Sequence, residues 1–511
     1  MDRFIEERSA ERLRAFLTLG DDRKRNWVVA GMLAGVALVV GALLAYLTPI
    51  GGVAVIAACV GALLILRDVR WGLFALLAIA CVLPFASLPF RIGFTPTFLD
   101  LVLGALYAVW AMRLITRHQD DFVLTPLGLP VLVFVALAVF SFVAGLSHSR
   151  PSSNDLRTFA EVLLGFGLFF LAVNQVRDES LLRQVTGAAI LAGGAEAVIG
   201  VLLYAVPKTW AVRFLSPLGR LGYPVGLGAL RYINDDPGRP MRAIGTNIDP
   251  NILGALLVIV MALAVTQMFA RRPVLPRTWV ALCAGFMGVC VFLTYSRSSM
   301  LGVVVAAGLV AMLRYRRLLV LLAVVGALVL LLPLTQAYVS HLVQGVLIED
   351  RSTQMRMGEY QDFFKLIRRY PWIGVGFVGA PDVDLYVAVA SIYFALAAQM
   401  GIVGLAAFLL VAAVYLVYLF RALRALPADS PWEPFVLGYG AAVSGSLVSG
   451  FLDHTLLTYP HAVALFWLVL GLGAASGHMA LQGAKERLQG RASGNGSHFV
   501  DKNGTCTCTE N

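Results

Sequence analysis

Long apolar runs separated by short polar connectors dominate the pattern of this chain. Runs of about 18–22 apolar residues recur, and each is long enough for a helix to cross roughly 30 Å of hydrocarbon. They predict an all-α polytopic membrane protein with about fourteen transmembrane helices, or about twelve if neighbouring runs are parsed differently. The predicted spans are residues 27–47, 51–66, 72–90, 98–115, 126–146, 156–173, 182–206, 252–269, 279–294, 300–313, 318–334, 390–420, 434–452 and 461–475.

The composition supports this class of protein. Of the 511 residues, 59% are hydrophobic and only 14% are charged, whereas roughly a quarter of the residues of a soluble protein are charged. The first apolar run is too long for a secretory signal and lacks a small-residue cleavage site. We therefore expect a cytoplasmic segment at 1–26, a membrane domain at 27–480 and a disordered Gly/Ser/Asn/Thr-rich tail at 481–511.

Basic residues in the connectors indicate the direction of the spans. The N-terminal segment carries seven Arg and Lys residues, which predicts a cytoplasmic N-terminus. Counted alternately, the connectors that would face the cytoplasm are basic at 67–70, 113–118, 177–183, 271–277, 314–317 and 421–424. The C-terminus then also faces the cytoplasm, and two long loops, at about 207–249 and 334–389, face outward. The formal net charge of +10 is mostly a signal of topology and does not indicate a nucleic-acid partner.

Both long outward loops are rich in arginine, against the charge rule that orients the other connectors. The planar guanidinium fork suits phosphate and carboxylate groups. The pattern therefore predicts that an anionic group is handled at the outer face of the membrane. The basic residues concerned include Arg213, Arg220, Arg231, Arg239, Arg242, Arg351, Arg356, Lys365, Arg368 and Arg369.

The first loop ends where a helix is predicted to begin. Asp249 is a natural N-cap with Pro250 at the first helical position, a structural role that is the alternative to a contact with substrate. The same helix start presents unpaired backbone N–H groups, which favour an anion. Arg242 lies shortly upstream and is expected to face the same point.

Arg297 and Arg356 are the other two arginines of interest. Arg297 lies in a tight outer hairpin at 295–299, where it either contacts a substrate or anchors the helix at the bilayer surface. Arg356 lies on a predicted amphipathic helix at about 352–370, which a proline ends. That helix either simply lies on the outer surface or projects Arg356 toward Arg242 and Arg297.

Further ionisable residues fall in or beside the predicted spans, where a charge is costly and is a functional candidate by default. Asp100, Arg157 and Asp453 lie near predicted ends, which favours structural roles, and Glu161 follows Arg157 by one helical turn. Glu196 lies deeper among small residues, so that a buried pair and a polar cavity are both open.

Four short motifs follow one another at predicted outer helix ends. They are Arg242 with Asp249-Pro-Asn251, Thr294-Tyr-Ser-Arg297, Arg356 with Arg369-Tyr-Pro371-Trp-Ile-Gly-Val-Gly376, and Gln399-Met-Gly401-Ile-Val-Gly404. Their order and spacing, over about 122–420, resemble the superfamily of bacterial O-antigen ligases and O-antigen or exopolysaccharide polymerases. The resemblance implies a GT-C-like glycosyltransferase of the bacterial inner membrane, with a periplasmic active site. Its conserved arginines map onto Arg242, Arg297 and Arg356 as catalytic residues.

One departure from the family pattern bears on the reaction. The ligase branch carries His-Asn eleven residues before the glycine that aligns with Gly401, whereas this chain has Ala390-Ser391 there. This favours a polymerase that joins undecaprenyl-diphosphate-linked repeat units into an exopolysaccharide or O-antigen chain. A ligase that transfers the glycan to lipid A core is the alternative. From another class, a lipid-oligosaccharide flippase or exporter would place polar groups at the midplane of its spans.

The expected chemistry needs neither a metal nor another cofactor. Preorganised arginines can neutralise the charge that develops on a diphosphate leaving group. The expected partners are the lipid-linked donor, an acceptor glycan, membrane lipids and a chain-length regulator. Glu359, Asp382 and Asp384 are candidate bases for the acceptor hydroxyl, and His341 is read as a surface residue. The residues expected to contact substrate are Asp249, Asn251, Arg239, Glu359, Asp382 and Asp384.

Overall fold

The computed structural model describes residues 60–61, 63–88, 94–115, 122–147, 150–347, 351–377, 389–427 and 430–494. Contacts divide the chain into Met1–Leu64 and Ile65–Asn511, and the second unit holds nearly all of these residues. The first predicted span and most of the second lie outside the described residues.

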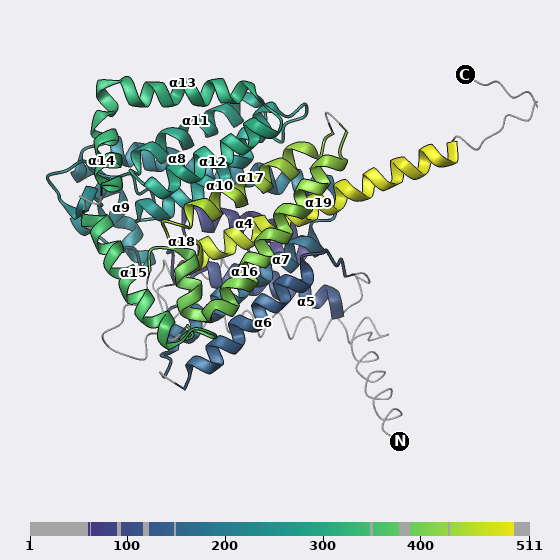
Figure 1. Cartoon of the computed structure of the whole chain (residues 1–511), viewed down its shortest axis with the longest axis horizontal. Coiled ribbons are helices and arrows are strands. Elements are labelled where there is room, and N and C mark those ends of the chain that lie inside the picture. The colour runs from purple at the N-terminus through teal and green to yellow at the C-terminus, as the bar shows by residue number, and fades with distance from the viewer. Residues whose placement is uncertain are drawn as a thin grey trace, which may run out of the picture. The chain divides into compact units, whose positions relative to one another are not determined.

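The twelve spans predicted from residue 72 onward each coincide with a helix (Figure 1). Within the described ranges the only β-pairing consists of two isolated bridges, so the predicted all-α membrane class is confirmed. Seven of the helices, α5, α6, α7, α8, α10, α16 and α19, are long and apolar enough to cross a membrane. The twelve are α4 Val69–Val82, α5 Phe98–Ile115, α6 Gly128–Gly145, α7 Ser153–Gln175, α8 Glu179–Ala205, α10 Pro250–Phe269, α11 Arg277–Leu293, α12 Arg297–Leu313, α13 Arg317–Leu331, α16 Ile392–Ala425, α17 Glu433–Ser449 and α19 Pro460–Gly494.

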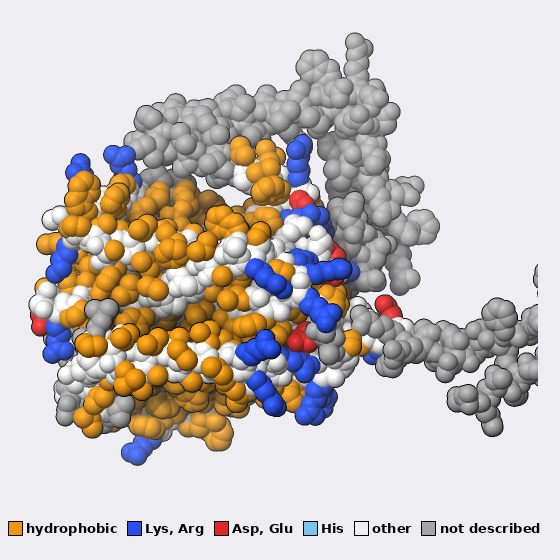
Figure 2. All heavy atoms as spheres, turned by 90° about the horizontal axis from the view of Figure 1, so that it is seen from above, with side chains coloured by type: hydrophobic (Ala, Val, Ile, Leu, Met, Phe, Trp, Pro, Cys, Tyr) orange, Lys and Arg blue, Asp and Glu red, His pale blue; other side chains and the backbone are white. Residues whose placement is uncertain are grey.

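Buried apolar helices form the centre of this unit. In α10 and α19, 83% and 94% of the most apolar stretch is buried, against 28% in α5. A helix that is apolar on all sides belongs inside a bundle, which places α10 and α19 in the core. Small residues let α12 and α17 approach closely, because Gly302 faces the backbone of Gly445. Figure 2 shows the complementary outer surface, which is largely hydrophobic with Lys and Arg toward its ends.

The two long loops contain short helices. The first loop holds α9 Lys208–Leu215, η1 Ser216–Leu221, η2 Leu227–Ala229 and η3 Ile233–Asp235. The second holds η4 Pro333–Thr335, α14 Gln336–Val346 and α15 Arg351–Arg369, and a short α18 Thr455–Thr458 precedes α19. α15 confirms the helix predicted at about 352–370. In Figure 1, α9, α14 and α15 all appear at the left end of the long helices.

The span predicted at 390–420 is not one continuous helix. α16 breaks at Gly401, whose φ of 67° is left-handed and suits glycine. Backbone bonds seat the segment after α15 against this break: Ile402 N–H donates to the Pro371 carbonyl at 2.8 Å, and Val375 N–H donates to the Ala398 carbonyl at 2.9 Å. A β-carbon on Gly401 would collide with the Trp372 carbonyl. The motif that ends in Pro371-Trp-Ile-Gly-Val-Gly376 and the motif around Gly401 therefore pack together as one structural unit, the joint at Gly401.

Two other boundaries differ from the sequence prediction. α4 ends at Val82 rather than near residue 90, because Pro84 cannot donate a helical N–H and disfavours helix at Leu83. α19 continues to Gly494, so residues 481–494 are helical and not disordered. The run Ala484-Lys-Glu-Arg-Leu-Gln consists of strong helix formers, which outweighs the polar composition of the tail.

Candidate functional site

The structure brings the three singled-out arginines together around one small cavity. Its volume is about 40 Å³, and we call it the arginine cavity. It is lined by Ile233, Asn234, Arg242, Asn251, Tyr295, Ser296, Arg297 and Arg356. The arginines come from three separate segments: the end of the first loop, the start of α12, and α15. The arrangement that projects Arg356 toward Arg242 and Arg297 is the one observed.

Arg242 is held on both sides of its guanidinium. Its Nε donates to the Thr294 carbonyl at 2.7 Å, and its Nη2 donates to Oδ1 of Asn251 at 2.8 Å. Its backbone is also fixed, because Arg242 N–H donates to the Arg231 carbonyl at 2.9 Å. The first loop is thereby attached to the α11–α12 hairpin and to the start of α10. The Arg242 side chain is therefore held in one position before a ligand binds.

The start of α10 has the predicted cap. Asp249 Oδ1 accepts from the N–H groups of Asn251 at 2.7 Å and Ile252 at 3.3 Å, with Pro250 at the first helical position. The carboxylate therefore satisfies the donors that a free helix end would offer to an anion. Asn251, by contrast, turns its side chain to Arg242 and lines the cavity.

Arg297 begins α12 directly after a strained turn. Tyr295 has a φ of 52°, and Ser296 precedes the helix in extended conformation. The hydroxyls of Ser296 and Ser298 lie 3.0 Å apart, and Ser299 Oγ donates to Ser296 Oγ at 2.9 Å. These buried hydroxyls give the hairpin a fixed shape, so that the position of Arg297 follows from the fold of the turn.

Arg356 and Glu359 lie one turn apart on α15, and helix geometry puts them on the same side. The stacked rings of Phe363 and Phe394, 4.5 Å apart, fix α15 against α16. Glu359 Oε2 accepts the N–H of Ala390 at 2.9 Å. Burial raises the pKa of Glu359, while the Ala390 hydrogen bond and the charges of His454 and Arg356 oppose that rise.

The lining of the cavity includes three arginines and no acidic side chain. Burial lowers the pKa of Arg242 to about 10, with the charges of Asp249, Asp453 and Asp235 opposing that shift and the charge of Arg356 adding to it. No ion pair among the described residues includes Arg242 or Arg356. Partly buried guanidinium groups that repel one another favour a bound anion.

Strained backbone is concentrated around the cavity. Asn234 and Tyr295, which both line it, have φ values of 56° and 52°, and Ile248 at the end of the first loop has 62°. A positive φ is uncommon for residues other than glycine and a true outlier for a β-branched one. Such conformations persist only where surrounding contacts over-determine them, and they are enriched at ligand sites.

Two residues at or beside the cavity were not predicted from the sequence. Tyr338 of α14 is 1% exposed, and its ring stacks on Phe292 with centroids 4.5 Å apart. The Tyr338 hydroxyl and Asn234 Oδ1 are buried with no hydrogen-bond partner in the described part of the chain. Arg242 and Arg297 are close enough for their charges to act on the phenol. Neither residue belongs to a motif, so the sequence offers no signal for them.

Glu196 joins the end of the first loop to the core through hydrogen bonds. It is fully buried in α8 and accepts from Thr246 N–H at 2.7 Å and Asn247 Nδ2 at 2.9 Å. Thr246 Oγ1 lies 2.8 Å from Glu196 Oε2 and 2.6 Å from the carbonyl of Val82 at the end of α4. The segment between Arg242 and Asn251 is therefore fastened to α8 and α4.

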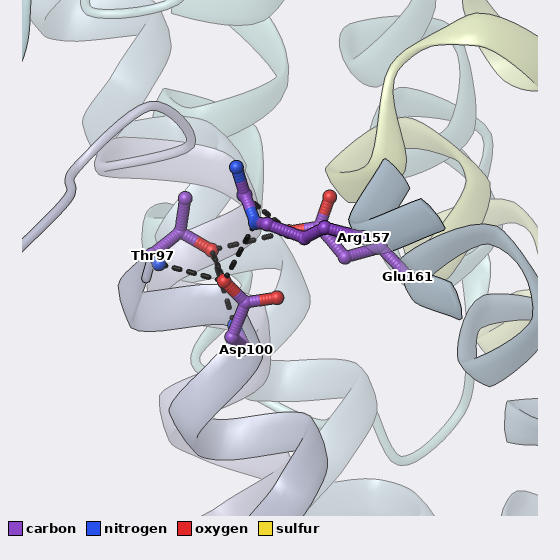
Figure 3. Close-up of polar contacts among 4 residues, drawn as sticks. All are labelled: Thr97, Asp100, Arg157 and Glu161. Atoms are coloured by element: carbon purple, nitrogen blue, oxygen red, sulfur yellow. Dashed lines mark hydrogen bonds and ion pairs between the residues drawn. The ribbon is translucent and has the colours of Figure 1, made fainter. Parts of the chain in front are cut away.

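The ionisable residues Asp100, Arg157 and Glu161 contact one another beside Thr97 (Figure 3). Arg157 Nε lies 3.2 Å from Asp100 Oδ2, and Arg157 Nη2 lies 2.7 Å from Glu161 Oε1. Thr97 donates its N–H to Asp100 at 2.7 Å and its hydroxyl to Glu161 at 3.3 Å. Asp453 accepts from Thr455 N–H at 2.7 Å. These contacts are structural, as the positions of Asp100, Arg157 and Asp453 predicted.

Arg239, a further sequence candidate, does not line the cavity. Arg239 is exposed and faces Asp236 at 3.9 Å. Asp382 and Asp384 lie outside the described residues. His341 lies on α14. No group of three or more His, Cys, Asp or Glu residues suited to a metal occurs within the described ranges.

Residues 282–409 match the family model described as O-Antigen ligase. The match contains Arg297, Arg356, Glu359 and the joint at Gly401. This part of the chain is therefore similar to the O-antigen ligase family, in keeping with the resemblance that the motifs indicated. No curated protein matches the chain significantly. The apolar helices indicate a membrane protein, and the matched segment suggests a role in ligase- or polymerase-type glycan transfer.

Proposed function

We propose that the protein is a polymerase that joins undecaprenyl-diphosphate-linked oligosaccharide repeat units at the periplasmic face of the bacterial inner membrane. The observation that carries the proposal is the convergence of Arg242, Arg297 and Arg356 on one cavity. The connectors at the opposite helix ends are basic, which supports an outward-facing cavity. Cysteines introduced near Arg220 should react with a periplasmic reagent in intact cells, and labelling only after permeabilisation would contradict this orientation.

The arginines would act on the leaving group. The acceptor hydroxyl oxygen forms a bond to the anomeric carbon of the donor, and the bond from that carbon to the diphosphate oxygen breaks. The electron pair of the broken bond stays on the diphosphate, where the guanidinium groups stabilise it. A cavity of about 40 Å³ has room for little more than water. Entry of the diphosphate therefore requires the cavity to widen.

Glu359 is the candidate base best supported by geometry. It lies one helical turn from Arg356, which suits a group that takes the acceptor proton while Arg356 binds the departing phosphate. Its carboxylate accepts the N–H of Ala390, the position where the ligase branch has histidine. A carboxylate thus lies beside the position where this chain lacks an imidazole, so Glu359 could supply a base there. Asp382 and Asp384 remain alternative bases.

The decisive experiment uses the purified full-length protein and undecaprenyl-diphosphate-linked repeat units. A polymerase produces longer lipid-linked chains from the repeat unit alone, and Arg297→Ala should abolish this growth. Arg239→Ala is the matched control, because it removes an arginine of the first loop that does not line the cavity. Transfer only after addition of lipid A core would identify a ligase. Movement of the donor across vesicles without bond formation would identify a transporter.

A further inference from the structure

Two adjoining cavities lie at the helix ends opposite the arginine cavity. α10 begins at the Asp249 cap and ends at Phe269, and α12 begins at Arg297 and ends at Leu313. With 20 and 17 residues they are roughly 30 and 26 Å long. Phe269 and Leu313 both line the first of these cavities. It is therefore separated from the arginine cavity by about the thickness of a bilayer core.

The first cavity, the basic pocket, is lined by Phe269 and residues 312–317 and has a volume of about 500 Å³. Its aromatic wall is rigid, because Tyr315 stacks on Phe269 with centroids 4.8 Å apart. Arg314 serves the fold, since it lies 3.5 Å from Glu433 and donates to the Leu423 carbonyl at 3.2 Å.

The other two arginines of the basic pocket have no such role. Arg316 and Arg317 are exposed, and neither forms an ion pair within the part of the chain that the structure describes. Figure 2 shows Lys and Arg gathered toward its right-hand end, and the α12–α13 connector lies toward the same end in Figure 1. The pocket thus offers two cations beside an aromatic wall.

The second cavity, the apolar groove, runs between α12, α16 and α17. Its volume is about 320 Å³, and its walls include Leu309, Leu313, Leu416, Phe420, Val436 and Gly440. On α17 it extends over residues 436–444, a rise of roughly 12 Å. That distance fits within one leaflet, about half of the 30 Å hydrocarbon core. Leu313 lines both cavities, so the groove opens beside the basic pocket.

We propose that the basic pocket and the apolar groove together bind one anionic phospholipid, with its phosphodiester at Arg316 and Arg317 and an acyl chain in the groove. Charge complementarity selects the ligand. Guanidinium groups favour a phosphodiester, and a zwitterionic headgroup brings a cation that they repel. A basic pocket between membrane helices at the inner surface is suited to anionic headgroups. The groove distinguishes a lipid from a soluble phosphate. This proposal does not depend on the glycan-transfer reaction.

The test is native mass spectrometry of the detergent-solubilised full-length protein titrated with phosphatidylglycerol, and with phosphatidylcholine of the same acyl chains. We expect phosphatidylglycerol to bind more tightly. Arg316→Ala with Arg317→Ala should weaken it about 25-fold, at about fivefold for each arginine. The control pair Arg272→Ala with Arg421→Ala removes the same charge at the same helix ends, outside both cavities, and should leave the affinity nearly unchanged.

A second variant tests the groove. A β-carbon on Gly440 meets Leu419 at an ordinary 3.6 Å, so Gly440→Leu should fold and fill the groove, lowering phosphatidylglycerol affinity several-fold. Val417→Trp is the replacement if Gly440→Leu is unstable, since Val417 is half exposed on the groove wall. The proposal fails if the control pair loses as much affinity, if neither groove variant changes binding, or if phosphatidylcholine binds equally. It also fails if glycerol phosphate competes fully or undecaprenyl phosphate binds more tightly.

Discussion

Arg242 donates from Nη2 to Oδ1 of Asn251 at 2.8 Å, nine residues further along the chain. Together with the bond from Nε to Thr294, this uses two of the five N–H donors of the guanidinium and leaves the others for a ligand. A neutral amide orients the arginine without neutralising it. A carboxylate in the place of this amide would neutralise the positive charge of Arg242, which would then be less able to bind an anion in the cavity.

This relationship gives the first prediction. Asn251→Asp should raise the KM for the lipid-linked donor by about tenfold or more, because the new carboxylate competes with the diphosphate for Arg242. Asn251→Ala should have the smaller effect, since it only loosens the arginine. Steady-state kinetics with purified protein measure both. A larger loss in the alanine variant would mean that Asn251 does more than orient Arg242.

Each of the three cavity arginines should be required for polymer formation on its own. Arg242→Ala, Arg297→Ala and Arg356→Ala should each lower polymer formation about 100-fold or more at normal expression, as expected when one preorganised donor to a developing charge is removed. Lysine at these positions should restore little, because a point charge lacks the bidentate fork. Polymer length on gels and single-turnover rates report the effect. Near-normal polymer from two of the three alanine variants would refute a shared anion site.

Tyr338→Phe separates a ligand role from a structural one. The buried hydroxyl lacks a partner among the described residues, so its removal should leave the melting temperature unchanged or raise it. If the hydroxyl donates a hydrogen bond to the bound diphosphate, the affinity for the lipid-linked sugar donor should nevertheless fall about fivefold to tenfold. Thermal unfolding and donor binding, measured on the same preparation, give the answer. Unchanged affinity would remove Tyr338 from the site.

Glu359 predicts the pH dependence. A base must be ionised, and burial raises the pKa of Glu359 above its ordinary value of 4.5. The rate should therefore fall as the pH drops through this raised pKa, and Glu359→Gln should lower kcat and abolish that acidic limb. Because the folded-state pKa is raised, ionisation of Glu359 disfavours the fold, so its contribution to stability declines as the pH rises above the unfolded value. An unaltered pH–rate profile in the glutamine variant would mean that another carboxylate is the general base.

Glu196 should tolerate one substitution and not another. A glutamine can accept from Thr246 N–H and Asn247 through Oε1 and donate from Nε2 to the Thr246 hydroxyl, which then donates to Val82. Glu196→Gln should therefore stay within a few-fold of normal kcat and KM. Glu196→Ala leaves buried donors unpaired and should lower both the melting temperature and kcat. Equal losses in the two variants would show that the carboxylate itself is required.

Much of the architecture could be predicted because apolar run length and basic connectors are local signals. The approach of Arg242, Arg297 and Arg356 was also foreseeable, since the alternating order of the predicted spans puts all three on the same side of the membrane. The break at Gly401 was not, because it depends on the carbonyl of Trp372 arriving from a distant segment. Asn234 and Tyr338 became visible only in three dimensions, since their place at the cavity depends on how the loops fold back.

The helices beside the arginine cavity are short for a membrane. α11, α12 and α13 have 17, 17 and 15 residues, or roughly 26, 26 and 22 Å, against a hydrocarbon core of about 30 Å. Such hydrophobic mismatch is relieved by local thinning of the bilayer. Thinning on this side would draw the headgroup plane toward Arg297. A lipid-anchored phosphate would then have a shorter distance to travel from the headgroup layer to the arginine cavity. The bilayer itself would then help to deliver the substrate.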